Sequence, residues 1–249
     1  MKALPAIVLN SFIHFFNMPT YFIIGASSGI GKKLTENLVS SGNRVIATYF
    51  KNKPETNSGL AEYQYLNVLD ENIALDFLPD TLNGLVYCPG SINLRPFERI
   101  KPDDFVDDFN LQVTGAIKLI QAAMSRLKKA GNASIVLFST VAVQTGFPFH
   151  TQVSASKGAI EGLTRALAAE FAPKIRVNCI APSLTDTPLA ASILNTDQKR
   201  EANALRHPLK KTGTPVNIAD MAEFLLSEKG SWISGQIFHV DGGLSSLKV

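Results

Sequence analysis

The chain has 249 residues, of which 45% are apolar, and a formal net charge of +3. This composition excludes a disordered or fibrous chain, and the small charge, without a dense Lys/Arg run, excludes a nucleic-acid-binding surface. The 2 cysteines cannot form a disulfide scaffold, so we expect a reducing compartment, the cytoplasm. A chain of this length can bury the core of one α/β domain without cross-links.

The first segment, residues 1–17, differs in character from the rest of the chain. It is mostly apolar, but Pro5, Asn10 and His14 interrupt it, and a membrane span needs about 20 apolar residues. No small-x-small cleavage site follows it. We therefore interpret residues 1–17 as an added extension, Met18 as the true start and residues 18–249 as the domain, and we expect no membrane partner.

Short apolar runs alternate with stretches of helical periodicity from residue 20 onward. The predicted strands are Thr20–Ile24, Val45–Thr48, Tyr63–Leu66, Leu85–Cys88, Ser134–Phe138, Ile175–Ile180 and Gln236–Val240. The predicted helices are a stretch ending near Ser41, then Pro102–Lys129, Ser154–Phe171 and Ile218–Leu226. Most strands are continuous apolar runs, which is typical of a parallel sheet covered on both faces. We predict one Rossmann-like, doubly wound α/β domain with a seven-stranded parallel sheet.

A glycine-rich turn joins the first predicted strand to the first predicted helix. Glycine permits positive φ angles and a close approach of a ligand to the backbone. The start of a helix presents free N–H groups and the positive end of its dipole to a phosphate. In this strand–turn–helix context the turn predicts a dinucleotide phosphate site. Its candidate residues are Gly25, Ser27, Ser28, Gly29, Ile30 and Gly31.

The G-x-x-x-G-x-G spacing of this turn occurs together with three further motifs. These are SASKGAIEGLTRALAAEFAPKIRVNCIAP at residues 154–182, GTP…IA near residues 213–219 and GQIFHVDGG at residues 235–243. The combination resembles the short-chain dehydrogenase/reductase superfamily, especially its 3-oxoacyl-[acyl-carrier-protein] reductase-like members. The resemblance implies an oxidoreductase with a nicotinamide cofactor, a small-molecule carbonyl substrate and no metal. It also implies a homotetramer or homodimer.

The end of the second predicted strand bears on which dinucleotide binds. An NAD-preferring site has a carboxylate there for the ribose 2′-hydroxyl, but residues 47–53 contain no acid. Lys51 or Lys53 can neutralise a 2′-phosphate and Thr48 can hydrogen-bond to it, so we predict NADP(H) in preference to NAD(H); the alternative is that both lysines belong to a solvated loop. The resemblance adds further cofactor contacts at Asn67, Val68, Gly90, Pro182 and Thr187.

The resemblance also implies a catalytic Tyr and Lys spaced Y-x-x-x-K, with a Ser thirteen residues before the Tyr. In that scheme the Tyr protonates the product oxygen, and the Lys binds the nicotinamide ribose and lowers the phenol pKa. Lys157 matches the Lys, but Val153 stands at the Tyr position and Thr140 at the Ser position. Asn110, in the segment FNLQVTGAI, matches an Asn of the family's long helix and is expected to hold a water chain to Lys157.

His150, seven residues before Lys157, is the candidate replacement for the missing acid. The enoyl-reductase branch of the superfamily has its Tyr at this spacing, and imidazole titrates near neutral pH. The alternative is an ordinary loop histidine. Two functions therefore remain open. One is an NADPH-dependent reductase that uses Thr140, Lys157 and either His150 or water, and the other is an NADP(H)-binding homologue without turnover, acting as a sensor or partner subunit.

Two other segments carry expectations. The stretch from Leu184 to His207 is predicted to face the substrate as an apolar lid, with Leu189, Ile193 and Leu194 as its apolar residues. The fourth predicted strand ends in Tyr87-Cys88-Pro89-Gly90, where the family has N-N-A-G. We interpret Tyr87 and Cys88 as packing residues.

Overall fold

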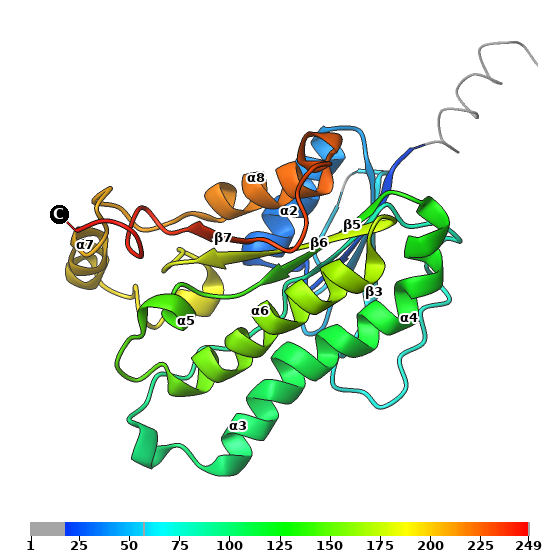
Figure 1. The fold of residues 1–249 in the computed structure, drawn as a ribbon. Helices are drawn as coiled ribbons and strands as arrows, with labels where there is room; N and C mark the ends of the chain where they lie inside the picture. The colour runs from blue at the N-terminus through cyan, green and yellow to red at the C-terminus, as the bar shows by residue number, and fades with distance from the viewer. Residues whose placement is uncertain (1–17, 57, 249) are drawn as a thin grey trace, which may run out of the picture.

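The computed structural model describes residues 18–56 and 58–248, so the predicted extension, residues 1–17, lies outside the described part. Seven parallel strands form one sheet in the order β3-β2-β1-β4-β5-β6-β7 (Figure 1). The strands are β1 Thr20–Ile24, β2 Arg44–Tyr49, β3 Ala61–Tyr65, β4 Gly84–Tyr87, β5 Ala133–Phe138, β6 Ile175–Pro182 and β7 Ile237–Val240. The predicted seven-stranded parallel sheet is confirmed.

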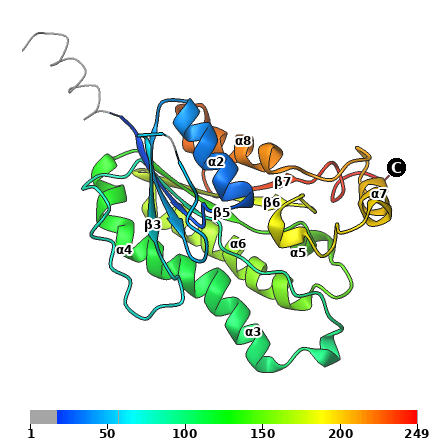
Figure 2. The same cartoon turned by 180° about the vertical axis from the view of Figure 1, so that it is seen from behind.

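Helices cover both faces of the sheet. They are α2 Gly29–Ser40, α3 Pro102–Phe109, α4 Gly115–Ala130, α5 Ala142–Thr145, α6 Thr151–Phe171, α7 Asp197–Leu205 and α8 Pro215–Leu226. Figures 1 and 2 show α2 and α8 side by side over one face and α4 and α6 over the other. Two apolar cores result, one on each face. In the described part of the chain no helix is long and apolar enough to cross a membrane.

The burial of the strands explains their sequence. Every residue of β1, β4 and β5 is buried, which requires the continuous apolar runs that predicted a two-sided parallel sheet. In the described residues no helix joins β2 to β3 or β3 to β4, and none of the predicted helices lies there. Three leucines of the β3–β4 loop, Leu75, Leu78 and Leu82, pack into the core beside α4 instead.

The predicted long helix, residues 102–129, contains an irregular turn. A π-helical turn, Asn110–Thr114, joins α3 to α4. The phenol of Tyr87 lies beneath it and donates a hydrogen bond to the Leu111 carbonyl. Burial raises the pKa of Tyr87 far above its usual range, and its ring belongs to the α4-side core. Tyr87 is therefore a packing residue, as predicted, with its hydroxyl used to satisfy the backbone of this turn.

Gly115, which follows the π-turn, lies against the Tyr87 hydroxyl so closely that an added Cβ would overlap it. We expect Gly115→Ala to lower the free energy of unfolding in urea by about 1–3 kcal/mol, the usual cost of overpacking. The cost should shrink in a Tyr87→Phe background, which lacks the overlapping oxygen. Gly162→Ala in α6 is the control, because nothing lies within 4 Å of its added Cβ. An equal loss from both glycine substitutions would contradict this account.

Candidate active site

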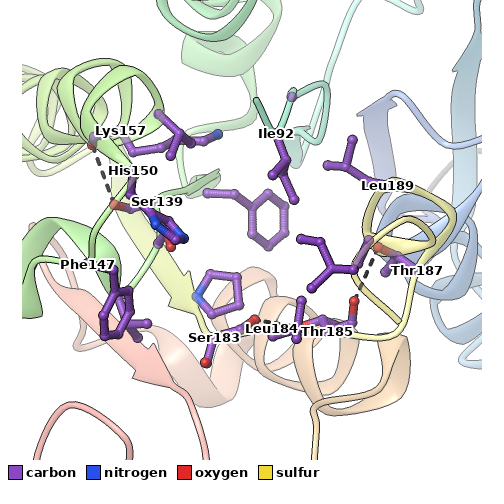
Figure 3. Close-up of a pocket in the computed structure, with 18 of the residues that line it drawn as sticks. Ile92, Ser139, Phe147, His150, Lys157, Ser183, Leu184, Thr185, Thr187 and Leu189 are labelled. Atoms are coloured by element: carbon purple, nitrogen blue, oxygen red, sulfur yellow. Dashed lines mark hydrogen bonds between the residues drawn. The ribbon is translucent and has the colours of Figure 1, made fainter. Parts of the chain in front are cut away.

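A cavity of about 240 Å³ lies at the carboxyl edge of the sheet (Figure 3). Residues that follow β1, β4, β5 and β6 line it, together with residues of α6 and of the segment after β6. In open α/β sheets this edge is where ligands bind. The lining is mainly apolar, and its polar side chains include Ser139, Thr140, His150, Lys157 and Arg206.

The glycine-rich turn, predicted from the sequence to be a phosphate cradle, lies at one side of the cavity, which its Ile30 lines. Gly25 and Gly29 have φ angles of +76° and +53°, which favour glycine. An added Cβ on Gly31 would overlap the Gly25 carbonyl oxygen, so α2 and the turn touch backbone to backbone. The first turn of α2 has no side-chain cap and no acidic residue. Its N–H groups are therefore available to an anion, and the residues present fit a dinucleotide pyrophosphate.

Thr48 does not have its predicted role. Its side chain is 1% exposed, and its hydroxyl oxygen accepts a hydrogen bond from the Gly25 N–H at 3.0 Å. Its carbonyl accepts a second bond from the Ala26 N–H at 2.8 Å. Both bonds hold the phosphate turn against β2, so Thr48 shapes the cradle instead of facing a 2′-phosphate. Lys51, just beyond β2, is exposed, and residues 47–53 contain no Asp or Glu that could bind a ribose 2′-hydroxyl.

Asn67 and Val68, two of the predicted cofactor contacts, have roles in the folded protein itself. The Asn67 side-chain oxygen accepts from the Leu69 N–H at 3.2 Å, and its amide nitrogen donates to Asp70 at 2.7 Å. Val68 is buried in the α4-side core. These bonds set the turn that follows β3, at the same edge of the sheet as the cradle. Asn67 remains half-buried.

Three of the family positions identified from the sequence converge in the cavity. Thr140, Val153 and Lys157 all line it. Val153 and Lys157 lie one turn apart on α6, and the Val153 side chain is 7% exposed. Burial lowers the pKa of Lys157 to about 8. The ammonium is thus the main form near neutral pH, although it can release its proton more readily than an ordinary lysine.

His150 also lines the cavity, at the start of α6. Its Nδ1 lies 2.8 Å from the Pro148 carbonyl oxygen. A carbonyl can only accept, so Nδ1 carries the hydrogen. Within residues 18–56 and 58–248, Nε2 has no hydrogen-bond partner. Its ring stands edge-on to Phe147, with 5.5 Å between the ring centroids. Figure 3 shows His150 and Lys157 on the same side of the cavity.

Asn110 is not part of this cavity, and the predicted water chain through it is not supported. Its side chain is exposed, accepts a hydrogen bond from the Thr114 hydroxyl at 3.3 Å and borders a separate surface groove. Gln112 lines the cavity in its place and is fully buried. The helix period could have revealed this residue, because Gln112, Ala116 and Leu119 follow the spacing of one buried face.

The segment after β6 closes the cavity over the phosphate turn. Pro182 and Thr187 line the cavity, as does Gly90 from the end of β4. An added Cβ on Gly29 would lie 3.3 Å from the Thr187 methyl group, so the two segments are in contact. Among the three residues of the predicted apolar lid, Leu189 and Ile193 line the cavity, whereas Leu194 is buried away from it.

Three further features of the cavity lining go beyond the roles predicted from the sequence. Cys88, interpreted as a packing residue, lines the cavity, and burial raises its pKa to about 12, so its thiol stays protonated. The Arg206 guanidinium lies 5.5 Å from the centre of the Phe147 ring. Ser183 and the buried His207 are joined by a hydrogen bond of 2.8 Å, which ties the segment after α7 to the end of β6. No local sequence signal pairs these residues.

Comparison with known proteins decides the family. The family model described as enoyl-(acyl carrier protein) reductase matches residues 25–245. The chain is 30% identical over 237 residues to the 3-oxoacyl-[acyl-carrier-protein] reductase FabG of Thermotoga maritima, which covers 89% of this chain and 96% of that protein. This chain belongs to the short-chain dehydrogenase/reductase (SDR) family. The SDR fold is equally clear in a short-chain dehydrogenase/reductase from Mycobacterium ulcerans, with a TM-score of 0.82, 27% identity and coverage of 91% and 90% of the two chains.

Two other SDR proteins bear on the site. A structure described as ElxO with NADP bound has a TM-score of 0.82 and 26% identity, and covers 92% of this chain and 100% of that chain. A protein of Xanthobacter autotrophicus described as inactive 2-(S)-hydroxypropyl-CoM dehydrogenase 2 is 37% identical over 171 residues, 67% of this chain and 74% of that protein. The family therefore includes both a structure with bound NADP and a member described as inactive.

Proposed function

We propose that this SDR protein binds NADP(H) and reduces a carbonyl or conjugated carbonyl group of a largely apolar small molecule. The observation that carries the proposal is a shared cavity: Ile30 of the phosphate turn, Thr140 and Lys157 all line it. The remaining wall is mainly apolar, which suits a substrate with an apolar body.

The preference for NADP(H) rests on the end of β2. No carboxylate is present there to bind a ribose 2′-hydroxyl, and the exposed Lys51 offers a positive charge for a 2′-phosphate. The NADP-bound ElxO structure supports the same preference by family analogy.

Each polar group of the cavity has a proposed part in the reaction. Bound NADPH would supply the hydride for the carbonyl carbon. The Thr140 hydroxyl would donate a hydrogen bond to the carbonyl oxygen, and the Lys157 ammonium would stabilise negative charge as it develops there. Protonated His150, or water, would complete the reaction by giving a proton to that oxygen.

A second function, NADP(H) binding without turnover, is favoured by one specific residue. Val153 occupies the position at which the family's Tyr donates its proton, and an isopropyl group cannot transfer one. The relative described as inactive is consistent with such a role within the family. In this case the protein would act as a cofactor sensor or as a partner subunit.

Cofactor titration by calorimetry tests the binding part of the proposal. We expect NADPH to bind roughly tenfold more tightly than NADH, which corresponds to about 1.4 kcal/mol. Lys51→Glu should remove the difference, because it replaces the positive charge near the 2′-phosphate by a carboxylate. Tighter binding of NADH would overturn the cofactor preference, and binding of neither nucleotide would overturn both functions.

A screen of carbonyl and enoyl compounds with NADPH separates the two functions. If the protein is a reductase with His150 as the acid, His150→Ala should lower kcat by about 10²- to 10⁴-fold, the usual contribution of a general acid. His239→Ala is the control, since His239 is an exposed residue of β7 outside the cavity. Turnover that survives His150→Ala assigns the proton to water. NADPH binding without any turnover favours the second function.

A further inference from the structure

A buried carboxyl group, Asp108, lies behind the cavity at the end of α3. Gln112 Nε2 donates to both of its oxygens at 2.8 Å, and the Ser156 hydroxyl donates to Oδ2 at 2.6 Å. The Ser91 hydroxyl donates to Oδ1. Three donors from three parts of the chain therefore converge on one carboxylate. Burying a charge is costly unless it is paired in this way, so this cluster calls for an explanation.

The cluster determines the orientation of the Gln112 amide. Its NH₂ group must face Asp108, because the opposite orientation would set the amide oxygen against the carboxylate oxygens. The amide oxygen, Oε1, therefore points away from Asp108. Within the described residues this buried atom has no hydrogen-bond partner. An unpaired buried acceptor is unfavourable. We therefore expect the hydrogen-bond donor to Oε1 to be among the groups that line the cavity.

The Lys157 ammonium is a hydrogen-bond donor that lies close to Gln112 Oε1. Gln112 Oε1 and Lys157 Nζ lie 3.3 and 3.7 Å from the same point, the Cβ position of Gly90. Lys157 Nζ makes no protein hydrogen bond in the part of the chain that the structure describes. Because Ser156 is the residue before Lys157, the cluster also holds the backbone of α6 at this position.

We propose that Asp108 is a positioning residue: it orients the Gln112 amide so that Oε1 accepts a hydrogen bond from the Lys157 ammonium. The acceptor and the nearby negative charge together favour the charged form of Lys157. Asp108 of α3, Cys88 after β4 and Cys179 of β6 are the titratable groups that act on Lys157. Burial raises the pKa of both cysteines to about 12, so Asp108 supplies the charge among them.

Titration of the Lys157 ¹³Cε NMR signal in the cofactor-free protein tests the proposal, with Lys157→Arg used to assign the signal. In the wild type we expect a titration midpoint at a pH of about 8. Lys157 is a charged ammonium below this pH and a neutral amine above it. Asp108→Asn should lower this midpoint by roughly one pH unit or more, as loss of a nearby opposite charge does. Asp107→Asn is the matched control, because Asp107 is an exposed neighbour on the same helix.

The role of Gln112 is tested by Gln112→Met, which keeps a side chain of similar length without Oε1. This change should also lower the midpoint, and the Asp108→Asn shift should be smaller in its background. An unchanged midpoint in Asp108→Asn, or an equal shift in Asp107→Asn, would overturn the proposal. Should Asp108→Asn fail to fold, an unchanged midpoint in Gln112→Met would overturn it as well.

A second readout is the affinity for NADPH, which rests on the proposed cofactor binding. At pH 7 we expect Asp108→Asn to weaken NADPH binding roughly tenfold and Asp107→Asn to leave it unchanged. Failure of the wild type to bind NADPH would refute the proposed function but not the positioning role, which the titration tests without cofactor. A normal midpoint shift with unchanged NADPH affinity would refute the link between this cluster and the cofactor.

Discussion

Replacing Val153 by tyrosine is expected to raise kcat/KM for carbonyl reduction by about 10²- to 10⁴-fold, the range that a positioned general acid contributes. Val153 lies one turn before Lys157 on α6 and lines the same cavity as Thr140. A phenol at this position would extend into the cavity beside the Lys157 ammonium. The positive charge of the ammonium would lower the pKa of the phenol. Steady-state kinetics with NADPH and a panel of carbonyl compounds measures the effect.

Val153→Phe is the matched control for this prediction. It introduces the same ring without the hydroxyl, so it separates proton donation from a change in cavity shape. We expect no gain from Val153→Phe. Equal rates for the Tyr and Phe variants would show that a phenol at residue 153 does not contribute to turnover, and would favour His150 or water as the proton donor.

Gly31→Ala is expected to damage both the fold and the cofactor site. The added Cβ would overlap the Gly25 carbonyl oxygen and approach the Ala26 Cα to 3.1 Å. Backbone atoms cannot rotate away as a side chain can, so the phosphate turn must shift. We expect a loss of about 1–3 kcal/mol in the free energy of unfolding. NADPH binding should weaken roughly tenfold or more, the equivalent of one lost hydrogen bond to a charged group.

Urea denaturation and calorimetric titration measure the two effects of Gly31→Ala. Gly59→Ala is the control, because it lies in the loop before β3 and nothing is within 4 Å of its added Cβ. Normal NADPH affinity in a destabilised Gly31→Ala protein would mean that the phosphate does not sit on this turn. That result would contradict the proposed cofactor site while leaving the packing argument intact.

Most of the sheet could be predicted because the buried strands are largely apolar runs, with few polar interruptions such as Ser134 and Asn178. The predicted bounds of β1 match the structure, and those of the other strands differ by at most two residues. Strand propensity and hydrophobic periodicity are local properties of the sequence, so both can be recognised without knowledge of the fold. Beside β3 no helix covers the sheet in the described residues, and leucines of the β3–β4 loop fill that space because the core offers them an apolar surface.

The contents of the cavity were harder to predict. The motif around Lys157 located Thr140, Val153 and Lys157 by spacing alone, since all three belong to one continuous stretch. The family motif pointed to Asn110 because it contains an asparagine, whereas the phase of the helix places Gln112 on the buried face. Thr48 has a side chain that can bind phosphate, but its burial and its bond to Gly25 are visible only once β2 lies beside β1.

The amino-acid sequence by itself determined the family fold, the glycine-rich turn between β1 and α2 and the spacing of Thr140, Val153 and Lys157, because each depends on residues that are close along the chain. Only the tertiary structure decided that Asp108 pairs with Gln112, Ser91 and Ser156. These donors come from the loop after β4, from the π-turn and from α6. A buried charge is tolerated only when the fold supplies its partners. Gln112 lies one helical turn from Asp108 along the chain, but Ser91 and Ser156 are 17 and 48 residues away, and packing brings them to the carboxylate across distances in sequence that no local pattern spans.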